Sequence, residues 1–477
     1  IMWIDNYFDN IRHLSKYPPL DVLRDRLKGV PLVVAGAGPS LKKNAALLKE
    51  FKGKAVIIAA ITAYKPLLNY GVVPDFIIAS EKVDLPEYFT YGEDDKNTRL
   101  IAAEVSHPNM FSREVKDKFV FFNPYMCLSS EHAGLWGSSY MLSSGGSVTT
   151  AALDVGVMLG CDPIVFIGQD LSFGENETHA PGGVYVAQDI KIDRDTGTVT
   201  VEEDYVTLKE KARSRFNLQW LKGLDGKPVP SKFDWVTFHQ WFESYVGILK
   251  QKGNPVKVIN ATEGGAYIEG MEHTTLRDVL ERHVREDIDL ERIIGEAVSE
   301  RKPVDFDGLI ASFENTGKAL KEMKGVAGAV LKEVRTAKRL FSKNGLTPEL
   351  KRNADRIKAL EERLFKLGGA SFIWEALVEN TYSLKGGLRE DRGASDSRRF
   401  EKALDDTNTS YRKISAMCAR FIPVLAKAAK TLTAVRLERG FREGECCSAD
   451  NEHGCEECAC RDARGGAEAS RSKRRAI

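Results

Sequence analysis

The segment from Pro31 to Leu41 constrains the fold of this chain more than any other segment. An apolar run at residues 32–35 passes directly into Gly-Ala-Gly-Pro-Ser, and a helical pattern follows at 41–51. Glycine permits a tight turn and a close backbone approach, and a serine at this point can cap the helix. Because a helix start offers free N–H groups and a partial positive charge, we expect a phosphate-binding turn made of Gly36, Gly38, Pro39 and Ser40.

The spacing of this turn excludes two common nucleotide motifs. The third glycine of the dinucleotide fingerprint would fall on Leu41, and no Gly-Lys-Ser/Thr follows as a P-loop would require. The structural alternative is a glycine turn that only joins a strand to a helix. Under the binding interpretation, a branched side chain at Gly38 would enter the ligand space and leave the fold intact.

Further apolar runs are followed by polar or glycine-rich signals. Runs at 55–60, 76–79, 164–167 and 256–260 are typical of parallel strands covered on both faces. Open α/β sheets bind ligands at the carboxyl ends of their strands, so the repetition favours a ligand crevice over a series of unrelated caps and turns. The candidate binding residues outside the first turn are Asp75, Glu81, Ser144, Gly145, Gly146, Ser147, Gln169, Asn260, Thr262, Glu263 and Gly264.

Five motifs together resemble the bacterial motility accessory factor family. They are Gly36-Ala-Gly-Pro-Ser-Leu41, Pro74-Asp75, Ser144-Gly-Gly-Ser-Val148, Ile167-Gly-Gln-Asp-Leu171 and Asn260-Ala-Thr-Glu-Gly-Gly-Ala266. The shared domain is also similar to the archaeal 6-hydroxymethylpterin diphosphokinase, and is described as MptE-like. The resemblance spans residues 1–275 by motif, and residues up to 440 by helical character. It implies a mostly parallel, Rossmann-like α/β sheet similar to that of sialyltransferases, and glycosylation of flagellin Ser/Thr with nonulosonic acids such as pseudaminic or legionaminic acid.

Three functions stay open on this evidence. Transfer of a nonulosonic acid from a CMP donor needs a phosphate cradle, groups that recognise the nucleoside, and a base for the acceptor hydroxyl. Residues 36–40 and 144–147 are the candidate cradles; Gln169, Asn260 and Thr262 suit the nucleoside. The base candidates are Asp170 and His179, the latter because its ordinary pKa suits proton transfer near neutral pH. We expect no metal site and no cofactor beyond the CMP-sugar substrate.

The two alternatives are an ATP-dependent 6-hydroxymethylpterin diphosphokinase and a non-catalytic flagellin-binding factor. The diphosphokinase would need Mg²⁺, for which Asp75, Glu81 and Asp170 are the candidate ligands. A kinase that acts on a small metabolite does not need a helical arm and a β-rich insertion. These parts fit an enzyme with a large protein acceptor better, which is evidence against the diphosphokinase.

The sequence divides into four predicted parts. A helical lead-in covers residues 1–28, and an α/β nucleotide-sugar-binding domain covers 29–272, with an insertion or lid at 176–235. A helical domain covers 273–440, and a Cys-rich, basic and disordered tail covers 441–477. Aromatic residues of a helix at 233–251 have helical spacing, which favours core packing over a sugar platform.

Composition limits the partners and the location. The formal net charge of the 477-residue chain is +1, which gives no broad electrostatic case for nucleic acid. No run of 18 apolar residues and no signal peptide is present, so we expect a cytoplasmic protein without membrane insertion. The start at Ile1 suggests a fragment or a processed start, and the family resemblance implies that an upstream domain is missing. Cysteines 127, 161 and 418 are expected to be reduced thiols, whereas those at 446, 447, 455, 458 and 460 can be read as zinc ligands or as part of a disordered tail.

Overall fold

The computed structural model describes residues 1–175, 177–205, 212–284, 287–345, 347–367, 371–374 and 396–446. Most of the predicted tail, including the cysteines from Cys447 onward, lies outside the described residues. The predicted domain boundaries stay predictions.

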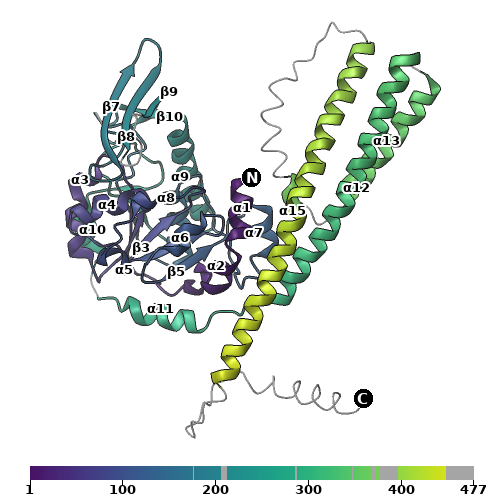
Figure 1. Ribbon diagram of the computed structural model, residues 1–477. Coiled ribbons are helices and arrows are strands. Elements are labelled where there is room, and N and C mark those ends of the chain that lie inside the picture. The colour runs from purple at the N-terminus through teal and green to yellow at the C-terminus, as the bar shows by residue number, and fades with distance from the viewer. Residues whose placement is uncertain are drawn as a thin grey trace, which may run out of the picture. The chain divides into compact units, whose positions relative to one another are not determined.

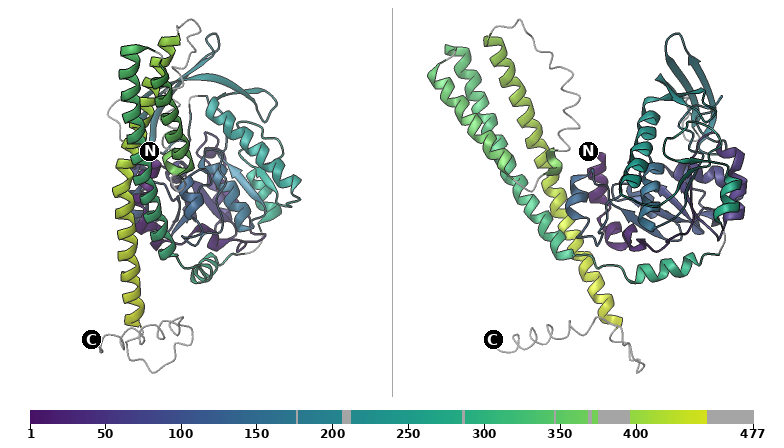
Figure 2. Two further views of the ribbon diagram at one scale, coloured as in Figure 1. Left: turned by 90° about the vertical axis from the view of Figure 1, so that its right-hand side faces the viewer. Right: turned by 180° about the vertical axis from the view of Figure 1, so that it is seen from behind.

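An eight-stranded parallel sheet is the centre of the fold (Figure 1, Figure 2). Its strand order is β12-β11-β6-β1-β2-β3-β4-β5, and each neighbouring pair is parallel. The strands are β1 (Leu32–Ala35), β2 (Val56–Ala60), β3 (Phe76–Ala79), β4 (Arg99–Ala103), β5 (Lys118–Phe121), β6 (Ile164–Ile167), β11 (Val258–Asn260) and β12 (Glu272–His273). This confirms the predicted fold class.

Side-chain alternation explains why the strands are apolar throughout. In β1, Leu32 and Val34 join the hydrophobic core on one face of the sheet, while Val33 and Ala35 join the core on the other. All four residues are buried. A strand covered by helices on both faces has no polar side, and this is the pattern that the sequence shows.

The order of the strands reverses at β1. From β1 the chain adds β2, β3, β4 and β5 in one direction, then returns to place β6 on the other side of β1. Such a reversal opens a crevice at the carboxyl ends of the two strands that flank it. The apolar run at 256–260 contains β11, which is not the edge of the sheet because β12 pairs beyond it.

Helices and short 3₁₀ turns connect the strands. The helices are α1 (Met2–Asp9), α2 (Ile11–Lys16), α3 (Leu41–Asn44), α4 (Ile61–Asn69), α5 (Glu93–Lys96), α6 (Pro108–Ser112), α7 (Cys127–His132), α8 (Val148–Leu159), α9 (Phe233–Gln251) and α10 (Leu276–His283). The bounds of α9 confirm the sequence prediction of a helix at 233–251. The helix predicted at 41–51 is shorter than expected, since α3 is one turn long and continues as a 3₁₀ helix, η2 (Ala45–Phe51).

A four-stranded antiparallel sheet occupies the predicted insertion at 176–235 (Figure 1). Its strands are β7 (Tyr185–Asp193), β8 (Thr198–Tyr205), β9 (Ala212–Lys222) and β10 (Pro228–Lys232), in the order β10-β9-β8-β7. A turn at Asp225-Gly226 joins β9 to β10, with Gly226 at φ +80°.

The C-terminal part is helical, as predicted. Its long elements are α11 (Leu290–Ser299), α12 (Phe306–Asn344), α13 (Pro348–Lys366) and α15 (Asp396–Cys446). Helix α12 is continuous through Gly325, because a single glycine lowers helix propensity without ending the helix. Ion pairs from Glu322 to Arg363 (2.7 Å) and from Glu333 to Arg356 (3.2 Å) join α12 to α13. Within the described ranges, no helix has the length and apolar character needed to cross a membrane.

Candidate functional site

Two loops at the reversal point are joined through their backbones. Gly36 follows β1, and its N–H donates to the carbonyl of Ile167 at the end of β6 (2.8 Å). The N–H of Gly38 donates to the carbonyl of Gly168 (2.8 Å). The carboxyl ends of β1 and β6 therefore continue their contact beyond the sheet.

Glycine is required here by packing between the loops. A Cβ atom on Gly38 would lie 2.0 Å from Oδ2 of Asp170 and 2.6 Å from the carbonyl oxygen of Gly168. A Cβ on Gly36 would lie 2.6 Å from the same carbonyl, and one on Gly265 would lie 2.3 Å from the carbonyl oxygen of Asp170. The expectation that a side chain at Gly38 enters the ligand space and spares the fold is wrong, because the added atom meets protein atoms first.

Asp170 holds the β1 turn in place. The Ser40 hydroxyl donates to Oδ2 of Asp170 (2.7 Å), and the Ser40 N–H donates to Oδ1 (3.2 Å). Ser40 makes no side-chain cap to α3, contrary to the sequence prediction. The N–H groups of Gly36, Gly38 and Ser40 all donate within the protein, so this turn does not present them to a phosphate as expected.

The start of α8 has the features that the first turn lacks. Ser147 is the N-cap of α8 and forms a capping box with Thr150. Thr150 Oγ1 also accepts from the N–H of Gly145 (2.8 Å), so the preceding Ser-Gly-Gly turn is fixed against the helix. The next two N–H groups, of Val148 and Thr149, have no acceptor among the described residues. Unpaired N–H groups at the start of a twelve-residue helix favour binding of an anion.

Two cavities meet at this helix start, and Ser147 and Val148 line both. The smaller cavity, of about 140 Å³, lies at the reversal point. Its wall includes Gly36, Gly38, Pro39, Thr62, Thr149, Gln169, Asp170, Thr178, His179, Trp235 and Phe238. The larger cavity, of about 480 Å³, lies toward β3, β4 and β5, and its wall includes Trp3, Ser80, Glu81, Val105, Phe121, Asn123, Met126, Ser144, Gly146 and Ala151.

Burial sets the protonation of the two base candidates, which both line the smaller cavity. Desolvation raises the pKa of Asp170 to about 6, against the lowering effect of its hydrogen bonds from Ser40. Desolvation and, to a lesser extent, Lys232 lower the pKa of His179 to about 4. His179 is therefore neutral at pH 7, with Nδ1 2.8 Å from the hydroxyl of Thr178.

Gln169 has an unused polar atom beside the smaller cavity. Its backbone N–H donates to Thr262 Oγ1 (3.1 Å), which fixes the residue at the end of β6. The side chain is only 5% exposed, and its Oε1 has no hydrogen-bond partner among the described residues. A buried amide oxygen without a partner is costly in the free protein, and a ligand donor in the cavity can satisfy it.

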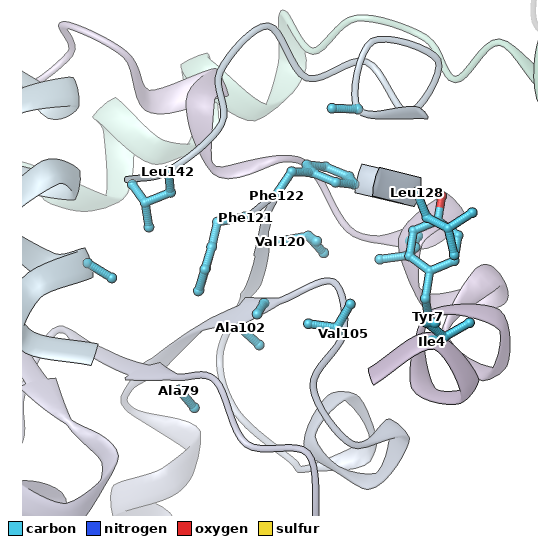
Figure 3. Packing of buried hydrophobic residues seen from close by; sticks show 14 of the residues in the cluster. Ile4, Tyr7, Ala79, Ala102, Val105, Val120, Phe121, Phe122, Leu128 and Leu142 are labelled. Atoms are coloured by element: carbon cyan, nitrogen blue, oxygen red, sulfur yellow. The ribbon is translucent and has the colours of Figure 1, made fainter. Parts of the chain in front are cut away.

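The larger cavity is mainly an apolar chamber with one acidic side chain on its wall. Figure 3 shows its neighbours Val105 and Phe121 packed among the ends of β3, β4 and β5. Glu81 follows β3, and burial raises the pKa of its carboxyl group. Its backbone carbonyl accepts from the His107 N–H (2.7 Å), which fixes the chain at that point. Its carboxylate has no hydrogen-bond or ion-pair partner in the part of the chain that the structure describes.

Asp75 is wrongly assigned to the site by the sequence. It precedes β3, so it lies at the amino end of a strand whose carboxyl end carries Glu81. Its carboxylate accepts from the Ile57 N–H (2.9 Å) and forms an ion pair with Lys52. Neither of the two cavities includes it, so Asp75 cannot share a magnesium ion at this edge with Glu81 and Asp170.

The predicted residues after β11 support the site and do not line either cavity. Thr262 accepts from Gln169, and Asn260 Oδ1 accepts from the Thr262 N–H (3.1 Å). Glu263 accepts from Asn44 Nδ2 (3.2 Å) and from the N–H of Leu276 at the start of α10 (3.1 Å). These residues and Gly264 connect the last strands to the β1 turn. Asn260 and Thr262 therefore do not contact a nucleoside directly in either cavity, contrary to the expectation from the sequence.

Gly145 also has a packing role. A Cβ at this position would lie 2.4 Å from the ring of Trp241 on α9. Its neighbours in the same turn line the larger cavity, whereas Gly145 does not.

Several lining residues are missed by the sequence analysis. Trp235 and Phe238 of α9 reach the smaller cavity, whereas Phe242 of the same helix is fully buried in the core. Helical spacing alone does not separate these two roles. Thr62 and Trp3 are also missed. Thr62 lies in α4 and Trp3 lies in α1, and neither helix carries a sequence motif that indicates ligand binding.

Comparisons with known proteins agree with the α/β part of the fold. Residues 5–176 match the family model for 6-hydroxymethylpterin diphosphokinase MptE-like domains. The 6-hydroxymethyl-7,8-dihydropterin pyrophosphokinase of Methanocaldococcus jannaschii is 36% identical over 84 residues, which are 17% of this chain and 35% of the archaeal enzyme. The match thus spans about a third of that relative.

Among solved structures, the MAf glycosyltransferase from Magnetospirillum magneticum AMB-1 is similar at a TM-score of 0.45 and 15% identity, over 89% of this chain and 60% of that one. This is a distant likeness. The family match rests on the sequence of residues 5–176, which is less than half of the chain, and it makes this segment similar to MptE-like domains.

Proposed function

We propose that this protein is a transferase that moves a nonulosonic acid from a CMP donor to Ser/Thr of flagellin. The observation that carries the proposal is the start of α8, where two unpaired N–H groups lie between a polar cavity at the reversal point and a larger cavity beside it. An anionic group held there would have room on either side for two different substituents. A CMP-activated sugar has this form, with one phosphate between the nucleoside and the sugar.

The smaller cavity suits the nucleotide side of such a donor. It offers the free Oε1 of Gln169 to a donor group such as an exocyclic amine, and the rings of Trp235 and Phe238 as apolar walls. The phosphate would accept from the N–H groups of Val148 and Thr149, where the helix dipole adds a favourable interaction of roughly 0.3–1 kcal/mol. No residue in this arrangement depends on a metal ion.

A second candidate is an ATP-dependent 6-hydroxymethylpterin diphosphokinase. The MptE-like match and the 36% identity to the archaeal pyrophosphokinase over 84 residues favour it. Both reactions need a phosphate site at the same edge of the sheet, so that edge alone does not separate them. The diphosphokinase would require Mg²⁺ held between carboxylates. Glu81 and Asp170 are the candidates that line the cavities, because Asp75 lies at the other end of β3.

A ligand screen by thermal unfolding tests the choice. We expect CMP to raise the melting temperature in EDTA, because a ligand at one hundred times its dissociation constant stabilises the folded state by about 2.7 kcal/mol. ATP with Mg²⁺, 6-hydroxymethylpterin, and cytidine without a phosphate are the comparison ligands. A shift with ATP and Mg²⁺ but none with CMP would favour the diphosphokinase and contradict the proposal.

A further inference from the structure

The two cavities differ in the state of their acidic side chains. Asp170, on the smaller cavity, is 6% exposed and accepts from both the hydroxyl and the N–H of Ser40. Glu81, on the larger cavity, is accessible to a ligand, and its carboxylate has no partner among the described residues. A carboxylate already occupied by protein donors is a poor acceptor for a further proton, whereas a free one on a cavity wall is available.

The surroundings of Glu81 also suit proton transfer. The walls nearby are apolar or neutral, from Trp3, Val105, Phe121 and Met126. The charged neighbour that acts on its carboxyl group is Lys82, whose effect is smaller than that of burial, so the pKa of Glu81 lies above its ordinary value. A carboxylate with a raised pKa is a stronger base while it remains ionised.

We infer that the larger cavity receives the transferred sugar and the acceptor hydroxyl, and that Glu81 is the base that accepts the hydroxyl proton. This inference rests on the proposed function, since it needs the donor phosphate at the start of α8. Ser147 and Val148 border both cavities. A donor phosphate at that border therefore places its sugar in the larger cavity when its nucleoside occupies the smaller one.

The reaction balances without a further reactant. The oxygen of the acceptor Ser or Thr forms a bond to the anomeric carbon of the sugar, and the bond from that carbon to the phosphate oxygen breaks. The phosphate oxygen keeps the electron pair and leaves as CMP, stabilised by the N–H groups of α8. The hydroxyl proton passes to the Glu81 carboxylate and then to solvent.

The test compares Glu81→Gln with Glu87→Gln in the full chain. Both changes remove one acidic group, but Glu87 lies in the 3₁₀ turn Pro86–Tyr88 and lines neither of the two cavities. Sugar transfer is followed by mass spectrometry of flagellin incubated with a CMP-activated nonulosonic acid, and CMP affinity is measured by calorimetry. We expect Glu81→Gln to slow transfer by about 10² to 10⁴ with CMP affinity unchanged, and Glu87→Gln to behave as the wild type.

A second variant, Glu81→Asp, keeps a carboxylate on a shorter side chain and should restore part of the rate. If Glu81→Gln does not fold, the rate of Glu81→Asp still tests the role of the carboxylate. Wild-type transfer by a folded Glu81→Gln protein that binds CMP would overturn the role of Glu81 alone. Failure of the wild-type chain to bind CMP would overturn the proposed function and, with it, this inference.

Discussion

At the scale of single residues, Asp170 lies where the sequence places it and has hydrogen bonds that the sequence does not show. The apolar run of β6 and the Gln-Asp pair that ends it place Asp170 at the carboxyl edge of the sheet, which the structure confirms. The sequence does not show that Ser40, 130 residues earlier, donates twice to its carboxylate. Asp170 is thus a clamp between two loops, and this contact depends on tertiary structure alone.

The clamp has a measurable pH dependence. Burial raises the pKa of Asp170 from 3.8 to about 6, so the protonated form is favoured in the folded state. Its contribution to stability is therefore complete below about pH 4 and is lost as the pH rises through about 6. Since one pKa unit corresponds to about 1.4 kcal/mol, the full change is about 3 kcal/mol.

Asp170→Asn removes this titration and adds only a constant change from altered hydrogen bonding with Ser40. The difference in unfolding free energy between Asp170→Asn and the wild type should move in favour of the variant from pH 4 to pH 6 and then level off. Urea unfolding at several pH values measures it. A difference that does not vary with pH would show that Asp170 does not titrate as described.

At the scale of elements, the loops after β1, β6 and β11 form one packed unit. Close backbone contacts at Gly36, Gly38, Gly168 and Gly265 leave no space for a Cβ atom. The sequence analysis assigns Gly36 and Gly38 to ligand binding and does not include Gly168 and Gly265 among the candidate residues. Glycine gives the same signal when the approaching backbone belongs to the protein itself.

Gly38→Ala should therefore destabilise the protein by about 1–3 kcal/mol, the usual cost of overpacking. Gly247→Ala is the control, because Gly247 lies inside α9 and a Cβ there meets no atom within 4 Å. That change should leave stability unchanged or raise it by up to about 1 kcal/mol through helix propensity. Thermal unfolding distinguishes the two, and an equally stable Gly38→Ala protein would refute the packing argument.

Elements with local signals are predicted best from the sequence. The capping box at Ser147 and the left-handed Gly160 (φ +81°) set both ends of α8, and these signals are visible in the sequence. Strands β4 and β5 are not identified, because each is short and begins with a charged residue, Arg99 or Lys118. Asp75 is misplaced for a different reason: two carboxylates near one strand look equivalent in sequence, but the direction of the strand places them at opposite edges.

At the scale of the whole molecule, the reversal of strand order brings the functional parts together. It places β1 beside β6 and leaves a crevice at their carboxyl ends, and α8 begins where the two cavities meet. The sequence predicts the parallel sheet and the edge at which we propose that the ligand binds. It does not predict the division into two cavities, since α1, the strand ends and α9 contribute walls from distant parts of the chain.

The role of the helical region as a surface for a protein partner stays a prediction. Its helices α12 and α13 are joined by ion pairs, and no cluster of His, Cys, Asp and Glu that could hold a metal ion occurs among the described residues. We propose that this region recognises flagellin. The proposal follows from the proposed function, and from the fact that an enzyme acting on small molecules alone would not need such a helical region.

The central claim is that the start of α8 binds the phosphate of a nucleotide, with the nucleoside in the smaller cavity. A crystal structure of the protein grown with CMP tests it most directly. The account predicts phosphate oxygens within hydrogen-bond distance of the N–H groups of Val148 and Thr149, and a nucleoside donor on Oε1 of Gln169. CMP bound with its phosphate away from α8, or CMP absent from the crevice at saturating concentration, would contradict the account.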